Sequence, residues 1–262
     1  MDQKINNCRN SLFAMLGSTY SYKCKLNPVL QVHLWRTYNL PSLTSGLSAL
    51  TIRPPQMTPI ALFHHKILCE FLGLSQSSPK AGLYFLLGEL PLENKIHLET
   101  LSLFYNIWSN SQSRINQILK YILTMSNTNS TTWANHVRLL CIQYDLPDPL
   151  ALLNQPHWSK SRWKEVTSTK VIIHAENKWR QEASTNSKMT YLNVKLLGLS
   201  GKPHTALCNA ATTRDIPKLR IHIKFLTGDY LTYARQACKN ILPKTTFGGV
   251  LGLIILDDAI LI

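Results

Sequence analysis

The chain lacks most features that would indicate a secreted, zinc-finger or membrane-spanning protein. Its six cysteines include no C-x-x-C pair, so their spacing predicts neither a disulfide framework nor a zinc finger. The apolar run from Leu12 to Leu16 is too short for the core of a signal peptide. No stretch approaches the ~20 apolar residues that a membrane helix needs. We therefore expect an intracellular protein, nuclear or cytoplasmic, that is not secreted and has no membrane partner.

Catalytic signatures are also missing. The sequence contains no G-x-S-x-G and no P-loop, so it predicts neither an enzyme site nor a cofactor. Asp257-Asp258 resembles the aspartate pair that holds two metal ions in nucleotidyl transfer. Here the pair lies near the end of the chain without the context of a polymerase palm, and coincidence is the favoured interpretation.

Two His–Cys pairs have helical spacing that could suit a metal. His65 and Cys69 are four residues apart, as are His204 and Cys208, and four such ligands could form a tetrahedral zinc site. The alternative is a partly buried thiol beside an exposed imidazole. Without a tighter cluster the alternative is favoured, and no metal site is predicted.

Acidic residues are scarce. The chain has 28 Lys and Arg against 14 Asp and Glu, a net charge of +14 and a pI near 9.6. The excess is concentrated in residues 157–244, which carry 16 basic and 5 acidic side chains. This balance favours a polyanionic partner, nucleic acid first and acidic membrane second; a merely solvated surface is the alternative.

Apolar residues recur at helical spacing along most of the chain, which predicts a mainly α fold, a bundle-like array of helices without a substantial sheet. The clearest signals are an apolar helix over 83–87 joined at Gly88 to a helix over 91–108, and a long polar helix over 158–184. Pro54, Pro55 and Pro59 predict a loop, and Pro41 predicts a kink or break near Leu40. Further helices are expected over 4–16, from Pro28, and over 60–74, 112–125, 133–144, 217–226 and 229–239. Spacing places Ile115, Ile118, Leu119 and Ile122 on one face of the helix over 112–125. In the long helix the apolar stripe is expected at Trp163, Val166 and Ile173 and, slightly rotated, at Ile172, Ala175 and Trp179.

The pattern divides the chain into four segments. Residues 1–55 form a first helical segment, residues 56–156 a helical core unit, and residues 157–244 a basic helical segment. Residues 245–262 form an apolar tail with Asp257 and Asp258 inside it. The tail is either a β-prone or helical segment that packs back, or a frame-altered end.

Five short motifs appear in order: Leu40-Pro41-x-Leu43, Leu86-Leu87-Gly88-x-x-Pro91-Leu92-Glu93, Tyr144-x-Leu146-Pro147-Asp148, Tyr191-Leu192-Asn193 and Leu226-Thr227-Gly228-x-Tyr230. Together they resemble the region after the polymerase palm in non-LTR retrotransposon proteins that pair an endonuclease with a reverse transcriptase. The chain departs from that family at Gly82 and Glu99. Near Cys238 it also lacks the family's Cys/His knuckle.

The resemblance implies a thumb that packs on the primer–template duplex, making residues 1–55 thumb-like, followed by helices that contact RNA. Since the catalytic palm is absent, we expect a reverse-transcriptase-like fragment without polymerase activity on its own that binds RNA or an RNA/DNA duplex. The alternatives are a helical protein-interaction scaffold with no nucleic-acid partner, or a non-functional pseudogene product.

The expected nucleic-acid contacts are basic residues of the last helices, whose charges can neutralise phosphates: Lys160, Arg162, Lys164, Lys170, Arg180, Lys195, Lys218, Arg220, Lys224 and Arg235. Nearby aromatic residues could stack on exposed bases or fill the core: Trp158, Trp163, Trp179, Tyr230 and Tyr233. For any single Trp, a place in the core is the favoured interpretation.

Overall fold

The computed structural model describes residues 2–18, 27–125, 131–189, 191–199, 201–208 and 215–229. These residues form helices and their connections, with no β-strand among them, which confirms the predicted mainly α fold. Within the same ranges, none of the helices has both the length and the apolar character that crossing a bilayer requires.

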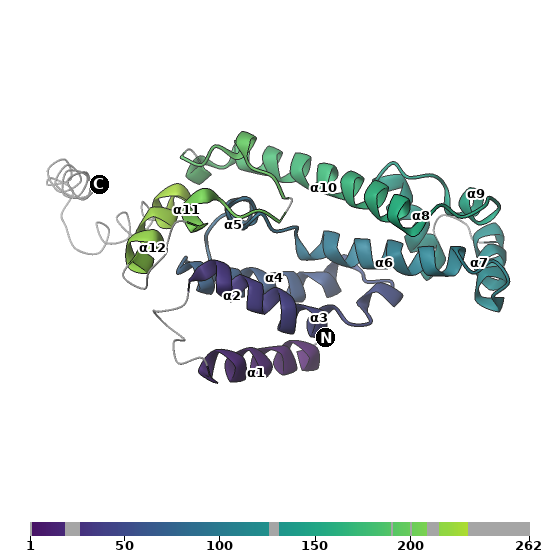
Figure 1. Cartoon of the computed structure of the whole chain (residues 1–262), viewed down its shortest axis with the longest axis horizontal. Coiled ribbons are helices and arrows are strands. Elements are labelled where there is room, and N and C mark those ends of the chain that lie inside the picture. The colour runs from purple at the N-terminus through teal and green to yellow at the C-terminus, as the bar shows by residue number, and fades with distance from the viewer. Residues whose placement is uncertain are drawn as a thin grey trace, which may run out of the picture.

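The helices form an elongated stack (Figure 1). α1 (Asp2–Ser18) lies at the bottom of the view, below a layer made by α2 (Pro28–Leu34), α3 (Leu40–Thr44) and α4 (Pro54–Leu72). The next layer is α5 (Lys80–Leu87) with α6 (Leu92–Trp108), and the long α10 (Lys160–Thr185) covers it. One end of the stack holds α7 (Arg114–Met125), α8 (Trp133–Gln143) and α9 (Pro149–Leu153). The opposite end holds α11 (Thr205–Cys208) and α12 (Asp215–Leu226).

Helix α5 is the centre of the fold because it is apolar on every side. All residues from Ala81 to Leu87 are buried, and a helix without a polar face has to be covered by others. α4 and α10 both pack against it. The centroid of the Tyr84 ring lies 4.9 Å from that of Trp179 on α10. The expected helical hairpin is therefore the buried core of the molecule.

Gly88 ends α5 in the left-handed conformation, with φ of 61°, and a second segment crosses directly over it. The backbone N–H of Gly201 donates to the Gly88 carbonyl at 2.8 Å, and that of His204 donates to the Leu86 carbonyl at 2.7 Å. A Cβ on Gly88 would overlap the backbone carbonyl of Lys202. The Leu-Leu-Gly motif thus marks the place where two distant segments meet backbone to backbone.

Two buried carboxylates fix the turns around this hairpin. Glu89 follows Gly88 and pairs with both Arg36 and Lys95, which satisfies a charge that would be costly to bury alone. Asp229 follows α12 and accepts hydrogen bonds from Ser75, at 2.8 Å from its backbone N–H and at 2.6 Å from its hydroxyl. Gly228, just before Asp229, lies so close to the Lys188 carbonyl that a Cβ would overlap it.

The proline-rich stretch at 54–59 is not the predicted loop. Helix α4 begins at Pro54, with Pro54 and Pro55 in its first turn, where a missing N–H loses no bond. Gln56 supports this start, because its side-chain oxygen accepts from the Arg53 N–H at 3.1 Å. At Pro41 the chain also stays helical, but a π-helical turn over Trp35–Asn39 comes directly before it. Such a wide turn accommodates the ring and the missing donor of a proline, so the expected break near Leu40 does not occur.

Burial differs from the expected apolar faces in two helices. On α7, Leu119 and Leu123 are buried together with Asn116, whereas Ile115 and Ile118 are 60% and 57% exposed. On α10, Val171 is fully buried, and Ile173, expected on the inner stripe, is half exposed. In both helices the partner surface selects a face rotated from the one that spacing predicts.

The first three expected segments share one continuous core. Buried apolar residues in mutual contact run from Ile5 on α1 to Ile223 on α12, and they include residues from each of the first three segments. The division at 55 and 156 remains a prediction. The apolar tail at 245–262, with Asp257 and Asp258, lies outside the described residues, as does the helix predicted at 229–239 except for Asp229.

We predict that Gly88→Ala lowers the free energy of unfolding by more than 2 kcal/mol, because the added Cβ clashes with Lys202 and the left-handed backbone disfavours Ala. Gly46→Ala is the matched control. Gly46 has φ of 74° and open space around its Cβ position, so only the conformational cost of about 1–2 kcal/mol applies. Urea denaturation of both variants measures the difference, and equal losses would contradict the crossing at Gly88.

Candidate nucleic-acid interface

Helix α10 carries five of the ten expected contacts, and its buried stripe decides where they lie. Six residues four apart face the core: Trp163, Thr167, Val171, Ala175, Trp179 and Ala183. Residues on either side of that stripe form two flanks, in which positions again differ by multiples of four. One flank contains Arg162, Lys170 and Lys178, and the other contains Lys160, Lys164 and Arg180.

The cations of the first flank are all engaged by the fold. Lys170 pairs with Asp145, its Nζ 2.7 Å from Oδ2, and Lys178 lies 3.7 Å from Glu93 at the start of α6. Arg162 places its guanidinium 4.8 Å from the centroid of the Trp158 ring. Lys170 is therefore a poorer phosphate ligand than the sequence suggests.

Two cations of the second flank are exposed to solvent. Lys160 and Lys164 are exposed, and within the described part of the chain neither makes an ion pair. Arg180, by contrast, pairs with Glu176 at 2.9 Å and donates to the Leu197 carbonyl at 3.1 Å. We call Lys160 and Lys164 the α10 patch.

The remaining expected contacts lie near α12. Lys218 and Lys195 are exposed, the latter on the short turn Val194–Leu196. Arg220 and Lys224 are half buried, and the Arg220 side chain lies against Gly73. Arg235 falls outside the described residues. The expected set is thus divided, because α12 and the start of α10 lie at opposite ends of the stack (Figure 1), and the 26 residues of α10 span about 39 Å.

Two of the three tryptophans expected near the interface are buried in the core. Trp163 and Trp179 are 2% and 8% exposed, and the Trp163 indole donates to the Leu101 carbonyl at 3.1 Å. Trp158 is half buried and remains accessible beside Arg162. Tyr230 and Tyr233 lie outside the described residues.

Sequence reasoning missed an aromatic pair on the surface. The rings of Tyr191 and Phe225 are tilted by 32°, with centroids 4.6 Å apart. Both side chains stay accessible, at 51% and 49% exposure. Their motifs, Tyr-Leu-Asn and the run before Thr-Gly, were visible, but only the fold brings them together. We call Tyr191, Lys195, Lys218 and Phe225 the α12 patch.

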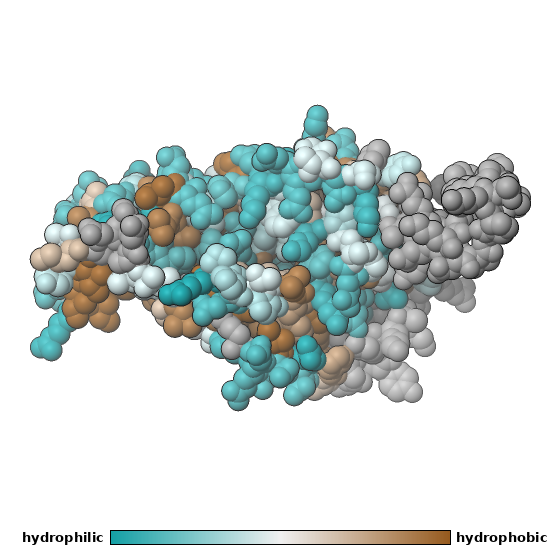
Figure 2. All heavy atoms as spheres, turned by 180° about the vertical axis from the view of Figure 1, so that it is seen from behind, coloured by the Kyte–Doolittle hydropathy of each residue, from teal (hydrophilic) through white to brown (hydrophobic). Residues whose placement is uncertain are grey.

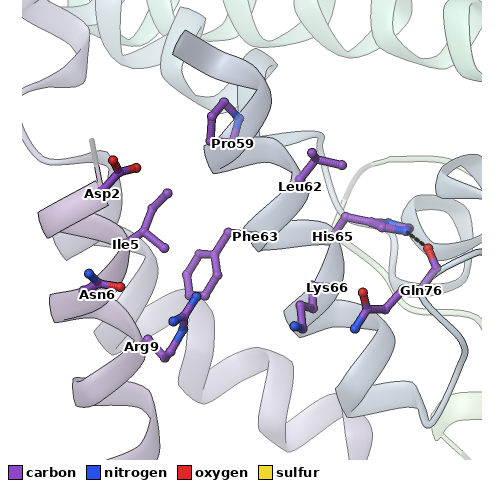
Figure 3. Close-up of a pocket in the computed structure, with 10 residues that line it drawn as sticks. All are labelled: Asp2, Ile5, Asn6, Arg9, Pro59, Leu62, Phe63, His65, Lys66 and Gln76. Atoms are coloured by element: carbon purple, nitrogen blue, oxygen red, sulfur yellow. Dashed lines mark hydrogen bonds between the residues drawn. The ribbon is translucent and has the colours of Figure 1, made fainter. Parts of the chain in front are cut away.

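The rest of the surface differs in character. Hydrophilic side chains cover most of the α10 edge in Figure 2, and hydrophobic ones gather at the end that carries α7. A groove of about 490 Å³ lies between α1 and α4, with Arg9 and Lys66 on its walls (Figure 3). Arg9 lies 5.7 Å from the centroid of the Phe63 ring. This groove lies on the opposite side of the stack from α10 (Figure 1) and contains none of the expected contacts.

The His–Cys pairs do not assemble a metal site. His65 Nε2 lies 3.5 Å from Cys69 Sγ, but burial lowers the pKa of the imidazole and raises the pKa of the thiol to about 12. The favoured alternative also fails in part, because His65 itself is buried. Among the residues that the structure describes, no three His, Cys, Asp or Glu side chains gather as ligands. Asp257 and Asp258 lie outside those residues.

Two buried histidines are neutral, chiefly because burial disfavours their charged form. His64, against Trp35, has no hydrogen-bond partner among the described residues, and its pKa falls to about 3 through burial and the nearby Lys95. The pKa of His97 falls to about 4, again chiefly through burial. Its Nδ1 faces the Tyr144 hydroxyl at 2.6 Å, and Asn94 donates to the same hydroxyl oxygen at 3.2 Å. These groups lie in the interior, apart from both patches.

Comparisons with known proteins give no relative: no family model, no curated protein and no solved structure matches the chain.

We predict that the protein loses stability as the pH falls from about 6.5 toward 4. Both histidines are neutral when folded and regain a pKa near 6.5 when unfolded, so below that pH the unfolded chain binds more protons. Each contributes up to about 1.4 kcal/mol per pH unit, and neither contributes above pH 7.5. In His64→Leu, urea denaturation at a series of pH values should give a shallower fall below pH 6.5. An unchanged slope would contradict the buried neutral state.

Proposed function

We propose that the chain binds nucleic acid through the phosphate backbone, using the α10 patch and the α12 patch, and that it has no polymerase activity on its own. RNA or an RNA/DNA duplex is the proposed partner. The α10 patch supplies Lys160 and Lys164, and the α12 patch supplies Lys195 and Lys218.

One observation supports this proposal above the others: the few acidic residues pair with particular cations, and in the described part of the chain the lysines of the two patches form no ion pair. Glu89 engages Arg36 and Lys95, Glu93 engages Lys178, Asp145 engages Lys170, and Glu176 engages Arg180. Lys160, Lys164, Lys195 and Lys218 have no such partner within the described ranges. Open cations of this kind are free to displace counterions from phosphates, a source of affinity that does not depend on base sequence.

The length of α10 guides the choice of probe. The helix is about 39 Å long, the length of about 11–12 base pairs at 3.4 Å per base pair. A ligand of 12 base pairs is therefore the appropriate probe.

We also propose that the chain derives from the C-terminal region of a non-LTR retrotransposon reverse transcriptase. This parentage rests on the five sequence motifs. Two of their glycines, Gly88 and Gly228, lie where another backbone segment leaves no room for a Cβ. Such positions tolerate few substitutions, which is a physical reason for those motifs to persist in a catalytically inactive fragment.

A protein-interaction scaffold is the second candidate, and α7 is the feature that favours it. Ile115, Ile118, Tyr121 and Met125 are each more than half exposed on this one helix. Exposed apolar surface of this kind is typical of contacts with other proteins. A scaffold would bind nucleic acid weakly and without the steep salt dependence expected of phosphate contacts.

We predict that a fluorescein-labelled 12-base-pair RNA/DNA duplex binds with an affinity that falls steeply between 50 and 200 mM salt, conditions under which several phosphate contacts give a clear loss. In the double variant Lys160→Ala/Lys164→Ala, the slope of log affinity against log salt should become shallower by about 1.8, close to 0.9 per lost contact. Fluorescence anisotropy measures both slopes.

The control removes the same charge from another surface. Arg9→Ala/Lys66→Ala changes two cations of the groove between α1 and α4 (Figure 3), and its slope should match that of the wild type. Equal slopes for all three proteins would reject the α10 patch. Binding without salt dependence would favour the scaffold.

A further inference from the structure

We infer that the Tyr191–Phe225 pair is a stacking site for an unpaired nucleobase, so that the α12 end of the molecule binds single-stranded RNA or DNA in preference to duplex. This inference rests on the nucleic-acid binding proposed above and identifies which form of nucleic acid one of its two patches takes.

The geometry of the pair is the first argument. With their centroids 4.6 Å apart and a tilt of 32°, each ring contacts the other, yet each stays about half exposed. Phe225 is the more unusual of the two, because phenylalanine is among the residues most often fully buried. An accessible ring already supported on one side by a second ring offers a flat apolar surface for another aromatic group.

The supporting backbone holds both rings in place. Ile216, Leu219 and Ile223 anchor α12 in the core, and Asp229 ties its C-terminal end to Ser75. Tyr191 lies between the buried Met189 and Leu192. A site formed before its ligand arrives loses little conformational entropy on binding.

The charge around the pair indicates an anionic ligand. Residues 188–228 contain seven Lys or Arg and a single acid, Asp215. Lys218 and Ile221 share the exposed face of α12 with Phe225, at positions seven and four before it. Lys195 follows Tyr191 by four residues and is exposed as well. An aromatic surface bordered by cations matches a base with its neighbouring phosphates better than it matches an uncharged apolar peptide.

The same geometry selects against duplex. A base inside a double helix is already stacked on both faces, so it reaches a protein ring only after unpairing. A base in a single strand presents its face freely, and every base has one. The pair should therefore add affinity for single strands without reading their sequence.

The test compares three labelled ligands on the full chain: U12, dT12 and a 12-base-pair RNA duplex. Tyr191→Ala and Phe225→Ala should each weaken binding of U12 and dT12 about tenfold, within the range for loss of one base–aromatic stack, and should change duplex affinity less than twofold. Tyr121→Ala is the matched control, since Tyr121 on α7 is 64% exposed and should not matter. Photo-cross-linking of a 4-thiouridine-containing U12, mapped by mass spectrometry, should mark peptides with Tyr191 or Phe225.

Three results would overturn the inference. If both variants bind U12 as the wild type does and cross-links map elsewhere, the pair is no base site, while nucleic-acid binding itself still stands. If single-strand and duplex affinities fall equally, the preference for single strands is wrong. If the wild type binds none of the three ligands at low salt, the proposed function fails and the stacking site fails with it.

Discussion

A short helix with no polar side determines how the rest of this chain is arranged. Every residue from Ala81 to Leu87 is buried, so α5 is stable only when other elements surround it. α4 and α10 pack on its sides, and the backbone of Gly201 and His204 bonds to the carbonyls at its end. Gly88 permits that close approach, because any side chain there would overlap Lys202. The long basic helix is therefore held against the core by the requirement to cover α5, and its orientation follows from that burial.

The orientation of α10 determines which of its cations form ion pairs. Once α10 lies along α5 and α6, one of its flanks faces Asp145 and Glu93. Lys170 and Lys178 on that flank form ion pairs with these two carboxylates. Because the chain has half as many acidic as basic residues, not every cation can have such a partner. Lys160 and Lys164 stay open at one end of the stack, and Lys195 and Lys218 stay open at the other. The proposed binding surface thus consists of lysines that form no ion pair with the carboxylates of the described residues.

Much of the fold could be predicted from local signals. The α5–α6 hairpin, α8 and α10 follow from apolar spacing and from glycine and proline at their ends, and Asn27 caps α2 as its position before Pro28 suggests. Pro54 and Pro55 begin a helix instead of a loop, because proline also suits the first turn of a helix. On α7 contacts with distant residues decide the outcome: Leu119 is buried as spacing predicts, but Ile115 and Ile118, expected on the same face, are exposed. For the candidate site, composition located the basic region, but neither the pairing of Lys170 with Asp145 nor the meeting of Tyr191 and Phe225 can be read from spacing.

Hydrogen–deuterium exchange of the whole chain, with and without a 12-nucleotide RNA, tests the central claim most directly. Backbone amides near a bound strand exchange more slowly, so the account predicts protection in the first turn of α10 and in residues 191–199, with no change in α1 or α7. Protection confined to α7, or an identical exchange pattern with and without RNA at low salt, would contradict it.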